Sequence, residues 1–271
     1  MNQYTTFSIN DHIYQIKDPM GVLMTLVIGK THALLVDTGY GLGDIKSYIS
    51  QITHLPLIVV ASHGHMDHTG GNYLFNQVYI HPLDMDLCKL HNSPTWRHNV
   101  YDNAYAMHLI DDTFDVETFI EQKEGHLLPL SNNQIFNLGD IHAKVIPMEG
   151  HTKGSIGILL EEDEILIVTD ATCPFVWLFL PESTSVTTYI QMLTRTLKLP
   201  FQHILLGHGR GIALPRSKVE DFLYTAKTID LKKAVKVTFH NFEQENSYCY
   251  TLGKMYDQND VGIVFDPHKL K

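Results

Sequence analysis

Four side chains of metal-ligand type follow directly on one apolar run of the sequence. Residues 57–61 have the composition of a buried strand, and two glycines close the segment at positions 70 and 71. The side chains between them are His63, His65, Asp67 and His68. Imidazole and carboxylate are the groups that a borderline-soft divalent cation such as Zn²⁺ accepts, and a loop after a strand can turn all four to one side. The sequence therefore predicts a metal site at the end of a buried strand.

Strand patterns come in two sets along the chain, and helix patterns follow each set. Spacings of three and four residues between apolar side chains predict the helices, and an acidic turn at 161–164 predicts a hairpin. The predicted strands are 22–28, 33–36, 57–61, 78–80, 143–146, 156–160, 165–168 and a short run near 205, and the predicted helices are 42–52, 186–197 and 215–233. This alternation predicts an α/β architecture of packed layers.

A single domain over residues 1–271 is predicted, because no Pro/Gly/Ser-rich linker and no internal repeat divides the chain. Two segments stand outside the strand and helix pattern. The C-terminal runs 235–239, 248–252 and 261–265 predict a small β appendage at about 234–271. The segment 81–133 is rich in aromatic side chains and histidine. It is interpreted either as a partly helical surface insertion or as a lid over a pocket. In the second interpretation the candidate pocket residues are Trp96, His98, Tyr101 and Tyr105.

Composition excludes several classes of protein. With 44% apolar and 18% charged residues the chain has a globular composition, and its net charge of −10 disfavours binding to nucleic acid or to an anionic membrane. No apolar run approaches the ~20 residues of a membrane-spanning helix, and the first residues lack the basic and apolar parts of a secretory signal. Three cysteines without a CxxC pair suit a reducing compartment. A cytoplasmic protein is expected.

Three further motifs occur downstream in a distinctive order. His151 lies in the turn GHTKGS, Asp170 ends the run ILIVTD, and His208 follows the run ILLG. Together with HxHxDH, this order resembles that of the metallo-β-lactamase superfamily of hydrolases, in which HxHxDH is followed by a distant His, an Asp and a His. The early sequence VDTG, which contains Asp37, is similar to the DTG turn of the same superfamily.

The resemblance implies a fold and a ligand set. The fold is the four-layer αββα sandwich of the superfamily, with the site at the ends of the strands. Seven positions are filled: one metal ion is held by His63, His65 and His151, a second by Asp67, His68 and His208, and Asp170 bridges the two. Asp37 is expected to orient ligands from behind. The implied cofactors are two divalent ions, with Zn²⁺ first and Mn²⁺ or Fe also compatible with the oxygen ligands.

Departures from other branches narrow the expected activity. True β-lactamases place a Cys in the second site or lack the bridging carboxylate, whereas position 170 is Asp. The nearest thiol, Cys173, is expected to be a small buried apolar side chain. The oxygen-reducing diiron branch has Glu where this chain has His65. The ligand set is similar to that of glyoxalase II, which favours hydrolysis of a small ester, thioester or lactone.

Two other functions stay open. A phosphodiesterase or nuclease of the same fold shares these ligands, but only Arg97 adds positive charge near Trp96. A non-catalytic, metal-bound ligand-binding protein is the other alternative, although such a protein has no evident need for a carboxylate bridge. The sequence leaves the oligomeric state and the physiological substrate open.

The ligand set also predicts a mechanism. Two cations that share Asp170 can share a water molecule, whose pKa falls from about 15.7 toward about 7, so that a bridging hydroxide attacks the carbonyl at neutral pH. Asp67 is the candidate catalytic residue, as a ligand first and a proton acceptor second. The expected partner is a small-molecule substrate, with no membrane and no nucleic acid.

Overall fold

The computed structural model describes residues 4–240, 242, 245–255, 257 and 259–271. The chain divides into two compact units. The first comprises residues 1–143 and 207–212, and the second comprises residues 144–206 and 213–271. The chain passes from the first unit to the second within β9 (His142–Pro147).

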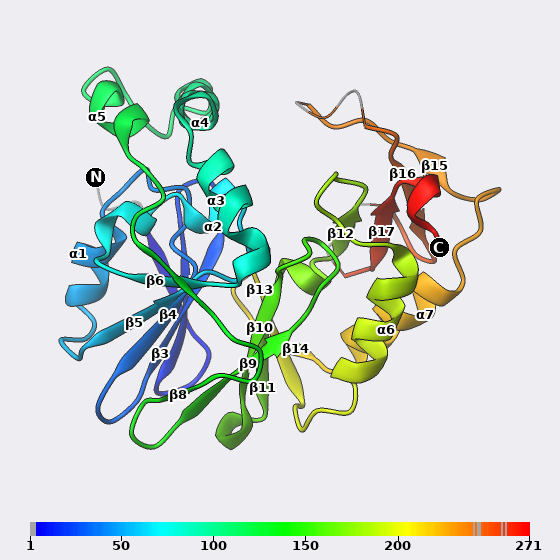
Figure 1. Cartoon of the computed structure of the whole chain (residues 1–271), viewed down its shortest axis with the longest axis horizontal. Helices are drawn as coiled ribbons and strands as arrows, with labels where there is room; N and C mark the ends of the chain where they lie inside the picture. Colours follow the sequence, from blue (N-terminus) through cyan, green and yellow to red (C-terminus); the bar gives the residue numbers. More distant parts are fainter. Residues whose placement is uncertain (1–3, 241, 243–244, 256, 258) are drawn as a thin grey trace. The chain divides into compact units, whose positions relative to one another are not determined.

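A seven-stranded sheet forms the centre of the first unit, in the order β1-β2-β3-β4-β5-β6-β7 (Figure 1). The pairs from β1 to β4 are antiparallel and the pairs from β4 to β7 are parallel. The strands are β1 (Thr5–Ser8), β2 (Ile13–Lys17), β3 (Leu23–Ile28), β4 (Ala33–Val36), β5 (Leu57–Val60), β6 (Val78–Ile80) and β7 (Leu127–Pro129), and the unit also holds β8 (Ile135–Asn137). The four strands predicted in this half are confirmed.

Two helices of the first unit bury apolar side chains in one cluster with the strands of this sheet. In α1 (Ile45–Ser50) the buried residues are Ile45 and Ile49, and α3 (Met85–His91) buries Cys88 in the same apolar cluster. The side chain of Asp44 caps α1 by accepting a hydrogen bond from the Ser47 backbone N–H, so the helix begins later than the predicted residue 42. The segment 81–133 is partly helical. It holds α3, α4 (Pro94–Ala106) and α5 (Val116–Glu121), the last two side by side in Figure 1.

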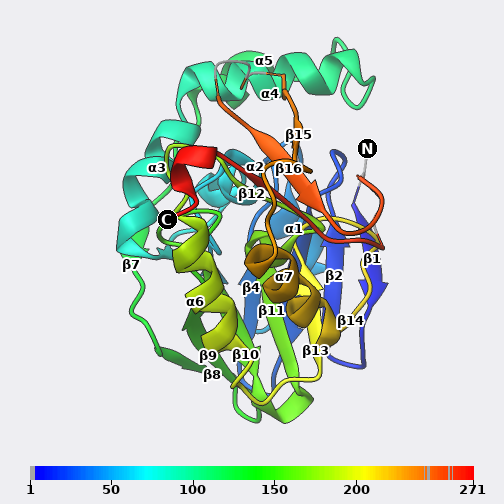
Figure 2. The same ribbon diagram turned by 90° about the vertical axis from the view of Figure 1, so that its right-hand side faces the viewer.

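The second unit has a central sheet in the order β14-β13-β11-β10-β9. β10 (Ile156–Leu160) and β11 (Ile165–Thr169) form the predicted antiparallel hairpin, and β13 (His203–Leu206) runs parallel to β11, with β14 (Leu214–Pro215) at the edge. The helices α6 (Val186–Thr196) and α7 (Ser217–Lys227) lie side by side, as Figure 2 shows. Their apolar faces join the strands in one core, through Tyr189 and Leu193 of α6 and Phe222 of α7.

The C-terminal runs form three strands of a separate sheet, whose fourth strand is β12 (Phe175–Leu178). Its order is β12-β17-β16-β15, with β12 parallel to β17 (Gly262–Phe265). β16 (Tyr248–Thr251) and β15 (Val235–Lys236) complete it. The strand predicted at 235–239 is shorter than expected, since β15 covers only residues 235 and 236. The sequence pattern did not identify β12, the partner of β17, as a strand of this sheet.

The predicted helix 215–233 was too long at both ends. The helix α7 spans Ser217–Lys227, and the Leu231 side chain beyond it is 48% exposed. Beyond the helix, Ile229 still packs against the core, but a single apolar contact does not compensate the cost of ordering another helical turn.

The described helices are short. The longest of them, α4, has 13 residues, against about 20 for a segment that crosses a bilayer. Within the described residues, none of the helices combines the length and the apolar character that a membrane crossing requires.

Candidate metal centre

The loop that follows β5 carries four of the predicted ligands. We call residues 63–70 the metal loop. His63 and His68 in it are 1% and 0% exposed. Part of the metal loop is helical: α2 (Met66–Thr69) begins after His65, so Asp67 and His68 lie on one helical turn rather than on an open loop. The backbone of this short turn is hydrogen-bonded within the protein, since Gly70 N donates to the Met66 carbonyl and Thr38 N donates to the His68 carbonyl.

The donor atoms of the metal loop lie close together. His63 Nε2 is 3.1 Å from His65 Nδ1, and His68 Nε2 is 3.4 Å from Asp67 Oδ2. His208 joins them from a distant part of the chain, with its Nε2 3.3 Å from the same carboxylate oxygen. Backbone pairing holds His208 there, because it bridges Val22 at the start of β3. The first unit thus gathers five of the seven predicted ligands.

Asp37 connects two of these histidines from behind. Its carboxylate is fully buried and accepts hydrogen bonds from His68 Nδ1 at 2.7 Å, from the Ser62 backbone N–H at 2.7 Å and from the Ser62 hydroxyl at 2.8 Å. The Ser62 oxygen lies 2.9 Å from His63 Nδ1, from which it accepts. With both Nδ1 atoms engaged, the Nε2 atoms of His63 and His68 are oriented toward the other donors. This is the usual arrangement of metal-binding histidines.

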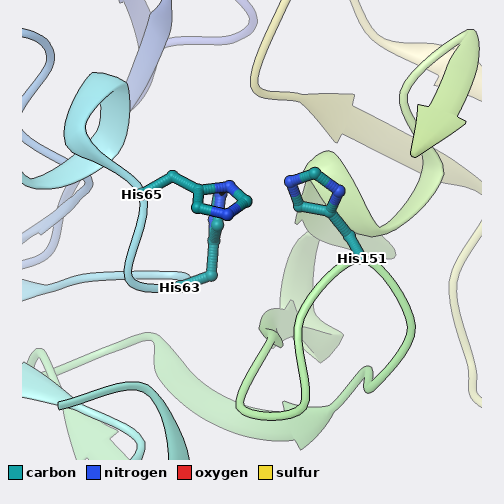
Figure 3. A group of neighbouring side chains, drawn as sticks. All are labelled: His63, His65 and His151. Atoms are coloured by element: carbon teal, nitrogen blue, oxygen red, sulfur yellow. Dashed lines mark hydrogen bonds between the residues drawn. The ribbon is translucent and has the colours of Figure 1, made fainter. Parts of the chain in front are cut away.

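The second unit holds the remaining two predicted ligands. His151 lies on the loop between β9 and β10, and Figure 3 draws its ring together with the rings of His63 and His65 from the metal loop. His151 Nδ1 donates to the Trp177 carbonyl at 2.9 Å, and the Ser183 hydroxyl donates to the His151 carbonyl at 2.7 Å. His151 Nε2 lies 3.9 Å from Asp170 Oδ2. The pattern of the first unit therefore recurs, with Nδ1 engaged and Nε2 facing a carboxylate.

The backbone directly before Asp170 is strained. Thr169 has φ +43° and ψ −117°, a conformation that a β-branched residue adopts at a cost of about 1–3 kcal/mol. The Cys173 thiol donates to Asp170 Oδ1 at 3.1 Å. Cys173 is buried, as expected, but it also contacts a predicted ligand, which the sequence analysis did not foresee.

The Asp67 carboxyl is held as an anion. Burial raises its pKa, but the charge of His68 and the hydrogen bonds from His208 and His68 outweigh burial and bring the pKa well below its ordinary value. An ionised carboxylate among histidine nitrogens is a donor set that a divalent cation prefers. His and Asp groups able to hold divalent metal ions are thus present in the chain.

The four candidate pocket residues differ in their surroundings. Trp96 stacks on His91 with ring centroids 4.0 Å apart, and His91 stacks on the metal-loop residue His65 at 4.9 Å. Tyr101 stacks on Phe114 within the insertion. The polar atoms of His98 and Tyr105 contact acidic residues of the same insertion, Asp102 and Asp112, and both side chains are exposed. Of the four, Trp96 is the one linked by ring contacts to the metal loop. The pocket assignment stays a prediction.

Several residues of the site escaped the sequence analysis. Ser62 directly precedes the HxHxDH motif. Its hydroxyl, at the end of a buried strand, was the sequence feature that could have indicated a contact to the ligands. The Trp177 contact uses a backbone carbonyl, which every residue carries. Arg97, which the sequence identifies only as a positive charge near Trp96, is fully buried and donates to the Gly70 carbonyl.

Comparison with known proteins identifies a family and several relatives. The family described as the metallo-beta-lactamase superfamily matches residues 18–208. The acyl-coenzyme A thioesterase MBLAC2 of Homo sapiens is 28% identical over 160 residues, covering 54% of this chain and 56% of that protein. MBLAC2 of Gallus gallus is 26% identical over 216 residues, covering 68% and 70%. The chain spans little more than half the length of the human relative.

Among solved structures, a metallo-beta-lactamase from Pontibacter korlensis superimposes with a TM-score of 0.58 at 16% identity, covering 84% of this chain and all of that one. At this identity the likeness shows the fold. The predicted α/β fold of the metallo-β-lactamase type is confirmed.

Proposed function

The chain belongs to the metallo-β-lactamase superfamily of hydrolases, and from this premise we propose that it is a metal-dependent thioesterase. The observation that carries the proposal is the Asp37–His68–Asp67–His208 network, in which His68 Nδ1 bonds to Asp37 while His68 Nε2 and His208 Nε2 face Asp67. The curated relatives named above are acyl-coenzyme A thioesterases, which favours an acyl thioester over an ester or lactone as substrate.

We propose that the chain holds two divalent ions, with Zn²⁺ first. The resemblance to the superfamily assigns His63, His65 and His151 to one ion, Asp67, His68 and His208 to the other, and Asp170 to both. The donor chemistry fits: the Nδ1 atoms of His63, His68 and His151 are engaged elsewhere, which leaves Nε2 for a cation. When bound, such ions supply hydroxide at neutral pH and polarise the carbonyl under attack.

The chain's own residues orient the ligands and hold protons. Asp37 keeps the His68 proton on Nδ1, and the Trp177 carbonyl does the same for His151. Because Asp67 is ionised at neutral pH, it is proposed as a ligand and as the acceptor for the proton that the attacking water releases.

The substrate class is tested with a panel of acyl-coenzyme A thioesters, aryl esters, lactones and a phosphodiester on one Zn²⁺-reconstituted preparation. We expect kcat/KM to be highest for a thioester, by at least about 10-fold, or ~1.4 kcal/mol of transition-state stabilisation. Preference for the phosphodiester would replace the proposal by the nuclease alternative. Absence of turnover on the whole panel with metal bound would favour a ligand-binding role.

Metal stoichiometry is a separate prediction. Protein reconstituted with excess Zn²⁺ or Mn²⁺ and desalted is expected to retain two ions per chain by elemental analysis, and Asp170→Ala to retain fewer than two. A plateau at one ion that Asp170→Ala leaves unchanged would contradict the dinuclear assignment.

A further inference from the structure

The segment 84–97 runs alongside the metal loop and contacts its backbone repeatedly. We call this segment the brace. Four hydrogen bonds join the two in the same order along both segments: Gly64 N to Asp84 Oδ2 at 2.9 Å, Met66 N to His91 Nδ1 at 3.4 Å, Asn92 Nδ2 to Thr69 Oγ1 at 2.9 Å, and Arg97 Nη2 to the Gly70 carbonyl at 3.0 Å. Three of the four use backbone atoms of the metal loop, so the brace constrains its path and not only its side chains.

The two segments approach too closely for ordinary side chains. A Cβ atom on Gly64 would lie 2.8 Å from the Asp84 carbonyl oxygen and 2.9 Å from the Cys88 nitrogen. These are backbone atoms, which cannot rotate away. A glycine between His63 and His65 is therefore required by the brace, and close backbone packing of this kind transmits small displacements.

Side chains add to the backbone contacts. The rings of His65 and His91 stack at 4.9 Å with an interplanar angle of 24°, and Trp96 covers the other face of His91. Met66 of the metal loop is buried in one apolar cluster with Val100 of α4 and Phe119 of α5. Five residues of the metal loop, at positions 64, 65, 66, 69 and 70, thus have a partner in or next to the brace.

Arg97 is the costly member of the brace. Its side chain is fully buried. Nη2 donates to the Gly70 carbonyl and to Asn92 Oδ1 at 2.7 Å, and the guanidinium carbon lies 5.3 Å from the Tyr73 ring and 5.1 Å from the Phe119 ring. Burial lowers the pKa of Arg97 to about 10, so it stays charged at neutral pH. An apolar side chain of similar volume usually serves stability as well as a buried cation does, so packing alone does not explain an arginine here.

We propose that Arg97 is a positioning residue for the metal centre. Through Gly70 and Asn92 it fixes the end of the metal loop, and the loop in turn presents His65, Asp67 and His68 in the geometry that a divalent cation needs. Binding sites lose affinity when the residues behind the ligands are removed, because the ligands then sample other orientations. The inference rests on the proposed metal-dependent function.

The test is the affinity for Zn²⁺ itself, measured by competition with a chromophoric chelator. Arg97→Met keeps the apolar packing between the two rings and removes the donors, and we expect it to weaken Zn²⁺ binding about 10–100-fold. Arg97→Lys keeps the charge but loses the planar fork, so partial rescue is expected. If Arg97→Met does not fold, the Zn²⁺ affinity of Arg97→Lys is the test instead. An affinity equal to that of the parent protein overturns the proposal.

Ala104→Gly is the matched control. Ala104 is a fully buried residue of the same helix, α4, and glycine there costs about 1 kcal/mol of stability without touching a bond to the metal loop. We expect this variant to lose stability and keep the parental Zn²⁺ affinity. Equal weakening by Ala104→Gly and Arg97→Met would show a general loss of stability and overturn the positioning role. If the parent protein itself binds no Zn²⁺, the proposed function fails instead.

Discussion

Replacing Asp67 by alanine is expected to abolish hydrolysis and to leave the protein folded. Asp67 Oδ2 lies 3.4 Å from His68 Nε2 and 3.3 Å from His208 Nε2. Replacing Asp67 by alanine therefore removes the negative charge that both rings face. Residues that only orient ligands are worth about 10–100-fold, so we expect a loss of more than about 100-fold in kcat/KM. The sheet of the first unit is held by apolar strands, whose burial does not depend on this carboxylate.

The measurement compares circular dichroism and thioester turnover on the same sample. Asp230→Ala is the control, because Asp230 belongs to the second unit and its carboxylate contacts residues that are not predicted ligands: it accepts from the Lys232 backbone N–H at 3.0 Å and lies 4.0 Å from Lys233 Nζ. Turnover of Asp67→Ala within a few-fold of the parent would remove Asp67 from the catalytic residues. Loss of the circular dichroism signal would show that the carboxylate supports the fold, and the role in chemistry would then need the isosteric Asp67→Asn.

The strands of the core could be predicted because their side chains share one property. β4 and β10 are buried at every position, and each coincides with its predicted range, 33–36 and 156–160. A continuous apolar run between turn residues has few other uses in a soluble chain. β1 gives no such signal, since three of its four residues are exposed, and it is a strand because β2 pairs with it.

The ligands could be predicted for a different reason. Imidazole and carboxylate groups are chemically distinctive, so HxHxDH and the later His, Asp and His residues are visible without a structure. Their arrangement was less predictable. The helical turn α2 was not foreseen, because four residues are too few for a periodic pattern.

The brace lay outside the reach of sequence analysis. Its contacts reach backbone atoms of residues 64, 66 and 70, and backbone atoms carry no sequence signal. Arginine is mostly a surface residue, so Arg97 was naturally considered as a charge available to a ligand rather than as a buried cation. The aromatic segment 81–133 was interpreted as a lid or a surface insertion, and neither interpretation includes hydrogen bonds to the metal loop.

Asp37→Asn is expected to separate metal binding from folding. The Asp37 backbone has φ +69°, a left-handed conformation that asparagine tolerates well, and the amide oxygen can still accept from the Ser62 backbone N–H. The amide nitrogen then faces His68 Nδ1, which must become an acceptor. The His68 proton moves to Nε2, the atom that is proposed to bind metal. We therefore expect Zn²⁺ affinity to fall about 10–100-fold while the circular dichroism spectrum is kept.

Asp37→Ala provides the contrast, since it removes the acceptor of all three hydrogen bonds and leaves the buried Ser62 and His68 donors without it. Each buried donor left unsatisfied costs about 1–3 kcal/mol, so this variant is expected to lose several kcal/mol of stability as well as Zn²⁺ affinity.

The two variants are compared by chelator competition, which measures Zn²⁺ affinity, and by thermal unfolding, which measures stability. If Asp37→Asn binds Zn²⁺ like the parent, the tautomer of His68 does not control the site. If it unfolds as readily as Asp37→Ala, the role of Asp37 lies in folding, because the charge rather than the proton position is then what the buried network requires.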